Sequence, residues 1–163
     1  MSEVRFARME DIPSLIDLGR QIHVQSRYAW MQFNATRLWS SLEAAIDNKQ
    51  HCLIVANQSH QDASAQDAVQ EMIGAMWAYA IALPFSSDFV AKIDYLYVLP
   101  RYRGTPVAMK MMAGFRRWAG NRQVSEISLL NAFGDDTAYT AKWLGKLGIK
   151  PVGGVHSMWL DRQ

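Results

Sequence analysis

The sequence has a single cysteine, Cys52, among its 163 residues, so no disulfide can form within one chain. Cys52 lies in an apolar run, where a small core residue is a better interpretation than a reactive thiol. The sequence also lacks an apolar run of the ~20 residues that a membrane span needs, and it shows no signal-peptide pattern. We therefore expect a cytoplasmic protein with no membrane partner.

A strong excess of charge is missing as well, because 17 basic and 15 acidic residues leave a formal charge of +2. General binding to nucleic acid is therefore not indicated. The four histidines show no metal-ligand spacing, and we expect no catalytic metal. Half of the residues are hydrophobic, which over this length is enough for one core. A single domain over residues 1–163 is expected.

Apolar periodicity predicts strands that alternate with helices. Helices are expected to begin near residues 9–13, after the cap Asn34, after Thr105 and at Asp135 or Asp136. The polar segment 57–70 is expected to form a long loop. The expected strands are residues 4–8, 52–56, 72–83, 89–98, 124–130 and 152–160. This order predicts an α/β fold with a mixed sheet.

The most informative segment is residues 95–112, which reads as a buried strand, a basic glycine turn and an amphipathic helix. Gly104 permits a backbone conformation that a side chain would hinder, Thr105 is the expected N-cap and Pro106 the first helical residue. Free N–H groups at such a helix start bind anions, so the segment predicts a phosphate site. Basic residues gather here, although those on the helix also fit a solvated face: Arg101, Arg103, Lys110, Arg116, Arg117 and Arg122.

This segment resembles the acyl-CoA signature of the GNAT superfamily of N-acetyltransferases. The matching residues are Leu96, Val98, Pro100, Tyr102, Arg103, Gly104 and Ala108. The order of the expected elements matches that family over essentially the whole chain. The resemblance implies the GNAT fold, a mostly antiparallel sheet flanked by about four helices, with acetyl-CoA as cofactor. Pro106 replaces a glycine of the family pattern and removes one N–H from the phosphate-binding turn.

In that family the signature strand and turn hold the cofactor mainly through backbone groups. The side chains of Leu96 and Val98 fit the core equally well, because the backbone makes the contacts. The resemblance implies that these residues bind the cofactor: Leu96, Val98, Arg101, Arg103, Gly104, Thr105, Val107, Ala108 and Asn131.

The family's reaction is direct attack of an amine on the acetyl thioester in a ternary complex, assisted by a base and an acid. The family often has a glutamate at the position of Lys92 and a tyrosine at that of Leu144, so other groups must serve here. Asp94, which a period of two places on the face of the signature residues, is the expected base. Pairing of Asp94 with a basic group is the alternative. Tyr139 is the expected acid, although it is offset on its helix.

His23, Arg27 and Tyr28, in and after the first helix, are expected to bind the acceptor, although Tyr28 also fits a core position. The predicted function is acetyl-CoA-dependent N-acetylation of a primary amine on a small molecule or a protein. GNAT proteins are often homodimers, so a second copy is an expected partner. The alternative is a GNAT-like protein that binds CoA, protein or nucleic acid with little or no turnover, because Pro106 and the two positions above depart from the pattern.

Overall fold

The chain folds around one five-stranded sheet, in a computed structural model that describes residues 2–60, 69–130, 137–154, 156–158 and 160. The strands lie in chain order, and neighbours are antiparallel except β4 and β5, which are parallel. The strands are β1 (Ser2–Phe6), β2 (His51–His60), β3 (Val69–Ala82), β4 (Phe89–Val98) and β5 (Val124–Leu129). The helices are α1 (Ile12–Gln25), α2 (Ala35–Asp47), α3 (Val107–Gly120) and α4 (Thr137–Lys146), with 3₁₀ turns η1 (Met9–Asp11) and η2 (Pro100–Tyr102). The expected mixed α/β fold is confirmed.

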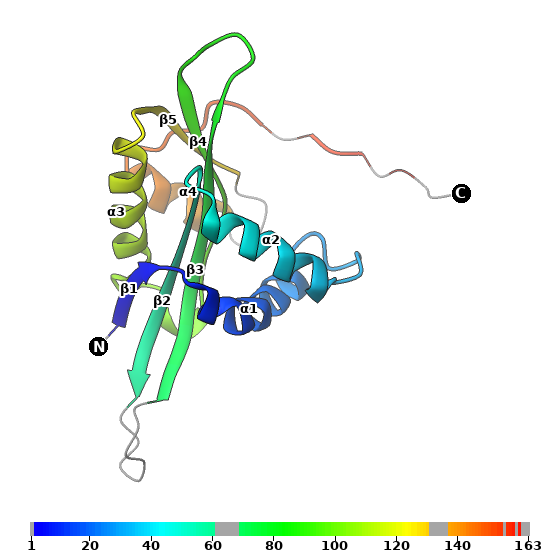
Figure 1. Cartoon of the computed structure of the whole chain (residues 1–163). Helices are drawn as coiled ribbons and strands as arrows, with labels where there is room; N and C mark the ends of the chain where they lie inside the picture. Colours follow the sequence, from blue (N-terminus) through cyan, green and yellow to red (C-terminus); the bar gives the residue numbers. More distant parts are fainter. Residues whose placement is uncertain (1, 61–68, 131–136, 155, 159, 161–163) are drawn as a thin grey trace.

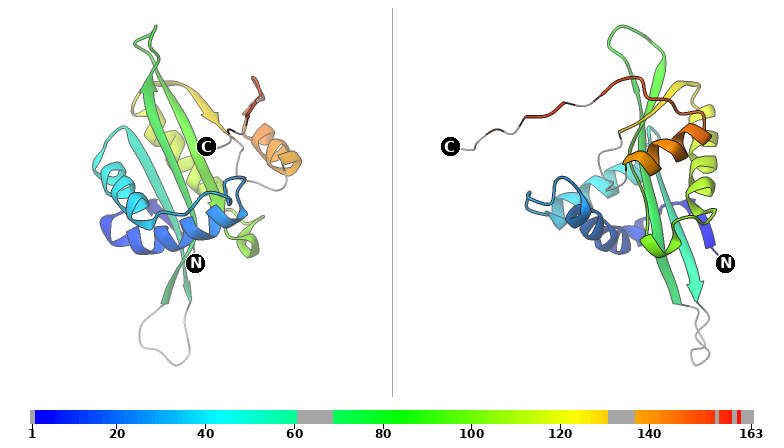
Figure 2. Two further views of the ribbon diagram at one scale, coloured as in Figure 1. Left: turned by 90° about the vertical axis from the view of Figure 1, so that its right-hand side faces the viewer. Right: turned by 180° about the vertical axis from the view of Figure 1, so that it is seen from behind.

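The helices form a layer on each face of the sheet (Figures 1 and 2), with α1 and α2 on one side and α3 and α4 on the other. Strand β2 faces both layers: Ile54 packs with Met111 and Phe115 of α3, and Val55 packs with the α1 and α2 side. Alternate residues of a strand point to opposite faces. A strand covered on both faces is apolar throughout, which explains the continuous run around Cys52.

Two helix N-caps, Asn34 and Thr105, were predicted from the sequence, and one of them is confirmed. The Asn34 side chain caps α2, because its Oδ1 accepts a hydrogen bond from the Arg37 N–H at 2.9 Å. The expectation for α3 is wrong by one residue, since Pro106 is the N-cap and the helix begins at Val107. The Thr105 hydroxyl does not cap the helix. It donates back to the Tyr102 carbonyl at 2.7 Å and closes the preceding turn.

The predicted loop over residues 57–70 is also corrected. Strands β2 and β3 extend into it, pairing Asn57 with Met72 and His60 with Val69, and residues 61–68 lie outside the described part. This end of the hairpin extends beyond the helices (Figure 1), so the side chains near its tip are exposed. Backbone pairing therefore continues where the apolar pattern that marks a strand in sequence has ended.

The expected last strand, residues 152–160, is absent from the described residues. Its described residues, 152–154, 156–158 and 160, instead lie away from the sheet (Figures 1 and 2). A β-strand needs a neighbour to pair its backbone N–H and C=O groups, and the segment has no such neighbour within the described part of its own chain.

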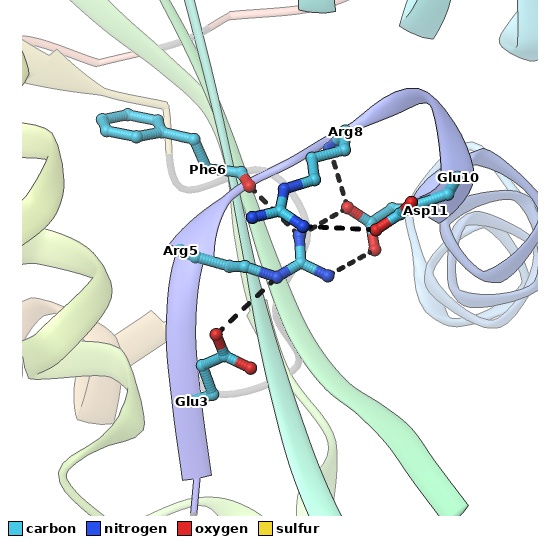
Figure 3. A network of polar contacts seen from close by, with 6 residues as sticks. All are labelled: Glu3, Arg5, Phe6, Arg8, Glu10 and Asp11. Carbon is cyan, nitrogen blue, oxygen red and sulfur yellow. Dashed lines mark hydrogen bonds and ion pairs between the residues drawn. The ribbon is translucent and has the colours of Figure 1, made fainter.

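A charged network joins β1 to the start of α1 (Figure 3). Arg5 Nη1 and Nη2 donate to the two carboxylate oxygens of Asp11 at 2.7 and 2.9 Å, and the Arg8 N–H donates to Asp11 Oδ2 at 2.7 Å. Burial of the Asp11 carboxyl opposes its ionisation, but these hydrogen bonds and the positive charge of Arg5 outweigh burial and lower its pKa. The network thereby fixes the direction in which the chain leaves β1.

We predict that Asp11→Asn lowers the free energy of unfolding at pH 7 by about 2–3 kcal/mol, because the half-buried Arg5 guanidinium loses its charged partner. The folded pKa of Asp11 is depressed, so its contribution is complete above the unfolded value of about 3.9 and is lost as pH falls through the folded value. Chemical denaturation at several pH values measures this difference, which should shrink in acid.

The control is Glu10→Gln, because the contact of Glu10 with Arg8, at 3.4 Å, is exposed. Its effect should stay within about 0.5 kcal/mol at every pH. An Asp11→Asn penalty that is the same at neutral and acid pH would show that the Asp11 charge is not its source.

Candidate active site

Strand β4 has two neighbours along its first half and one along its second. Its parallel pairing with β5 runs from Phe89, opposite Val124, to Ile93, opposite Leu129. On its other side, β4 stays paired with β3 as far as Val98. Among the described residues nothing pairs with the β5 side of β4 from residue 94 onward. The backbone groups on that edge are therefore available to a ligand.

A β-bulge lies where the two strands separate. Trp77 of β3 pairs with Tyr95 and Ala78 pairs with Ile93, so Asp94 is the extra residue. The period-two expectation for Asp94 is therefore wrong. Lys92 stands opposite Tyr79, and the side chain of Asp94 interacts with both, on the α1–α2 face. The signature residues Leu96 and Val98 pack against the core under α3, on the opposite face.

The surroundings of Asp94 adjust its acidity. Although the residue as a whole is exposed, partial burial of the carboxyl raises its pKa, against the opposing effects of a hydrogen bond with the Tyr79 side chain and of the nearby His51 and Lys92. The pKa of Tyr79 is raised by burial and by Asp94. A carboxylate whose basicity is increased in this way, next to the Tyr79 side chain at a strand bulge, is suited to accept a proton.

The turn between β4 and α3 exposes several backbone donors. Gly104 has φ of +82°, and an added Cβ would meet nothing within 4 Å. No hydrogen-bond partner is found among the described residues for the N–H groups of Gly104, Val107 and Ala108. Helix α3 therefore begins with unsatisfied donors despite Pro106, and such a helix start attracts an anion.

Two of the amides expected in this site have partners within the turn. The Arg103 N–H donates to the Pro100 carbonyl at 3.1 Å, and the Thr105 N–H donates to the Tyr102 carbonyl at 3.4 Å. The backbone N–H groups of Arg103 and Thr105 therefore stabilise the turn and are not free to bind an anion. The expected set of free amides at Arg103, Gly104, Thr105, Val107 and Ala108 is reduced to its other three members.

The two arginines of the turn also differ. Arg101 pairs with Glu71 of β3, which further accepts a hydrogen bond from the Tyr102 hydroxyl at 3.1 Å. Arg103 turns back to β4, where its Nε donates to the Val98 carbonyl at 3.3 Å and its guanidinium lies 5.8 Å from the Tyr97 ring centroid. Arg103 is thus the cation next to the open edge, whereas the charge of Arg101 is balanced by Glu71.

The expected acceptor residues lie at the C-terminal end of α1 and just after it. His23 is half-buried, with its ring 5.4 Å from that of Phe33, and its Nε2 has no hydrogen-bond partner among the described residues. Arg27 lies over the Tyr28 ring, with 5.2 Å from guanidinium carbon to ring centroid. This end of α1 is joined to β4 by the Tyr97 hydroxyl, which donates to Gln25 Oε1 at 3.0 Å.

Some expected residues cannot be placed. Asn131 lies outside the described residues, and although Tyr139 belongs to α4, its side chain is not described. Leu144 is buried in the core at 8% exposure. In the described part of the chain, no group of three or more His, Cys, Asp or Glu side chains could hold a metal ion. No helix there is long and apolar enough to cross a membrane.

Sequence reasoning missed Tyr79 and Glu71, which support Asp94 and the turn. Both belong to β3 and reach the site across the sheet, so their roles depend on the register of β3 against β4. The alternation of apolar and polar residues along β4 did not indicate the bulge, and it is the bulge that brings Asp94 close to Tyr79. A predicted β3–β4 hairpin with its register assigned would have been the only signal.

No family model matches the chain, and no curated protein matches its sequence. Solved structures do resemble it along its full length. The aminoglycoside N-acetyltransferase AAC(6')-Iy, in complex with a bisubstrate analogue containing CoA, has a TM-score of 0.71 at 17% identity and covers 100% of this chain and 99% of its own. Glucosamine-6-phosphate N-acetyltransferase from Arabidopsis thaliana gives 0.72 at 13% identity, with 99% of each chain covered.

A transcriptional regulator from Bacillus halodurans C-125 is also similar, with a TM-score of 0.70 at 15% identity over 98% of this chain and 100% of that chain. The chain therefore has the fold of the GNAT N-acetyltransferases, as its signature residues predicted. Identities this low establish the fold, whereas activity must be argued from the site itself.

We predict that Tyr79→Phe raises the pKa of Asp94 further, because it removes the hydrogen bond that favours the ionised carboxylate. Carbon NMR of the aspartate carboxyl groups during a pH titration measures this change. Tyr95→Phe is the matched control, since Tyr95 packs edge-on against Trp77 and does not hold the Asp94 carboxylate. An unchanged titration in Tyr79→Phe would remove Tyr79 from the site.

Proposed function

We propose that this protein is an acetyl-CoA-dependent N-acetyltransferase that acts on a primary amine of a small molecule or a protein. One observation carries the proposal: a carboxylate that can accept a proton, an unpaired strand edge and an anion-binding turn follow one another along a single stretch of chain. Asp94 stands at the bulge, the open edge of β4 comes next, and the turn around Gly104 leads into α3.

The residues present fit the cofactor. The free N–H groups of Gly104, Val107 and Ala108 would bind the pyrophosphate, and Arg103 would add a positive charge. The unpaired edge near Leu96 and Val98 offers backbone groups to the amides of the pantetheine arm. From residue 94 to residue 98 the strand extends about 13 Å at ~3.3 Å per residue, which leaves room for an extended arm between phosphate and thioester.

Acetyl-CoA supplies an activated acetyl thioester. The Asp94 carboxylate would take a proton from the acceptor amine, directly or through water, while the Tyr79 side chain favours its ionised form. A new N–C bond forms as the C–S bond breaks, and the departing thiolate takes up a proton. Tyr139 is the proposed donor of that proton, with water as the other source.

His23, Arg27 and Tyr28 are the proposed acceptor contacts, because the bond between Gln25 and Tyr97 joins their helix to β4. Two of the similar structures are named for the acetylation of amines on small molecules, aminoglycosides and glucosamine-6-phosphate. A small-molecule amine is therefore the first acceptor class to test. A cytoplasmic location fits the single buried thiol of Cys52.

A CoA-binding protein with little or no turnover is the second candidate. The burial of Leu144 favours it, since this position offers no proton donor where the family often has a tyrosine. The similar transcriptional regulator is consistent with a non-enzymatic use of the fold. The two candidates differ in one result, because binding of CoA without release of thiol in the presence of amines supports only the second.

We predict that Asp94→Asn lowers kcat by roughly 10²–10⁴-fold, because the proton acceptor is lost, while the dissociation constant of CoA stays the same. A thiol-release assay over a panel of small-molecule amines and lysine peptides measures turnover, and calorimetry measures binding. The control Asp88→Asn removes an exposed carboxylate of the β3–β4 turn and should change neither. Full turnover in Asp94→Asn would assign the base to another group.

We predict that acetyl-CoA at ~100 times its dissociation constant stabilises the protein by about 2.7 kcal/mol. Gly104→Asp should abolish this stabilisation by placing a carboxylate, at a position with φ of +82°, against the phosphate. Thermal melts with and without ligand measure it. Gly120→Asp makes the same charge change at the opposite end of α3, where no atom crowds the added side chain, and should retain the shift. A wild-type protein that acetyl-CoA does not stabilise would contradict the proposed function.

A further inference from the structure

A cavity of about 610 Å³ lies away from the candidate active site, between β1, the C-terminal end of α2, residues 47–49 and the second half of α3. From α3 it is lined by Gly114, Arg117 and Trp118, whereas the free amides of the glycine turn lie at the opposite end of that helix. Cavities of roughly 300–1,000 Å³ are typical of sites for small organic ligands. The size of this cavity therefore permits a ligand of that kind.

Several walls of the cavity are apolar. Phe6 of β1, Ile46 of α2 and Trp118 of α3 line it. Phe6 is 53% exposed, and its ring lies on the side of β1 away from the network of Arg5 and Asp11 (Figure 3). Covering an exposed aromatic ring with an apolar group removes both surfaces from water, which is favourable. The cavity is thus suited to a ligand with an apolar body.

Three cations, Lys49, Arg117 and Arg122, also line the cavity. Arg122 is fixed in its wall, because its Nε donates to the Lys49 carbonyl at 2.6 Å and its guanidinium carbon lies 4.4 Å from the Trp118 ring centroid. The side chains of Lys49 and Arg117 form no hydrogen bond or ion pair with any residue that the structure describes. Two cations without a partner at an apolar cavity are available to an anion.

The other ionisable groups of the lining set the charge of that anion. Asp11 balances the charge of Arg5 through hydrogen bonds of 2.7 and 2.9 Å. His51 Nδ1 accepts a hydrogen bond from Trp77 Nε1 at 3.0 Å, and the ring is counted as neutral. Asp47 and the C-terminal ends of α2 and α3, each end equivalent to about half a negative charge, offset part of the charge of the three cations. A net charge of about +1 remains, which a monoanion balances.

We propose that this cavity is a binding site for an organic monoanion in which one carboxylate is attached to an apolar body. The Arg117 guanidinium matches a carboxylate in geometry, with Lys49 adding positive charge, and the apolar body would contact Phe6 and Trp118. A nucleotide carries more negative charge than these walls balance. The inference is independent of the proposed acetyl transfer, because no residue of the glycine turn or of the open edge of β4 lines this cavity.

The first test compares charged and uncharged probes of the same shape by calorimetry. The probes are 1-naphthaleneacetate and octanoate, one with an aromatic body and one with an aliphatic body, and the uncharged amide of each acid. We expect at least one carboxylate to bind roughly tenfold or more tightly than its own amide. If neither carboxylate binds, or if each acid binds no better than its amide, the proposal is overturned.

The second test changes the charge of the wall in both directions. Arg117→Gln should weaken binding of the carboxylate roughly tenfold or more, whereas Asp47→Asn should strengthen it roughly two- to fivefold. Binding of the amide should change in neither variant. Arg116→Gln is the matched control, because Arg116 is the exposed neighbour of Arg117 on α3 and does not line the cavity. Carboxylate binding that Arg117→Gln leaves unchanged would contradict the site.

The third test locates the bound carboxylate by nuclear magnetic resonance. During a titration of the wild-type protein with the carboxylate probe, the backbone amide signals of residues 45–49 and 114–122 should shift most, because these segments border the cavity. Shifts concentrated instead at residues 94–108 would place the probe in the candidate active site and overturn the proposal.

Discussion

The hydrogen-bond pairing of β4 is the constraint on which the candidate site depends. Every backbone N–H and C=O of a buried strand needs a partner, and among the described residues β4 has two neighbours only as far as Ile93. Beyond that point β3 is its one described neighbour, and the other edge is open to a ligand. The bulge at Asp94 falls at the same place, so the separation of the strands and the redirection of an acidic side chain occur together. A straight, fully paired β4 would have neither the open edge nor the acid beside it.

Charged side chains near β4 lie close to groups of opposite charge: Asp94 lies near Lys92, and Arg101 pairs with Glu71. Burial raises the pKa of Asp94, while Tyr79, His51 and Lys92 act against it, so the carboxylate is more basic than usual. Lys92 stands where the GNAT family often has a glutamate, and here it stabilises the acid two residues further on. In the turn, Glu71 balances Arg101 and fixes the turn, which leaves Arg103 as the cation nearest the open edge.

The β4–β5 region has two unpaired strand edges among the described residues. On the β5 side of β4, the backbone from residue 94 onward has no neighbouring strand and leads to the free amides of the turn, which suits the proposed cofactor. The outer edge of β5 lies beside a cavity of about 960 Å³ whose walls include Leu129, Leu144 and Leu147.

The sequence by itself determined the fold class, the order of the elements through α4, the α2 cap at Asn34 and the glycine turn before α3, because each depends on local periodicity or on a residue with restricted backbone chemistry. The tertiary structure alone decided the register. It placed the bulge at Asp94 and so reversed the face of that side chain, brought Tyr79 and Glu71 to the site across the sheet, extended the polar ends of β2 and β3, and left the described residues of 152–160 outside the sheet. Strand pairing joins residues that are distant in sequence, and a shift of one residue changes the face on which every later side chain lies. Neither effect leaves a local mark in the sequence.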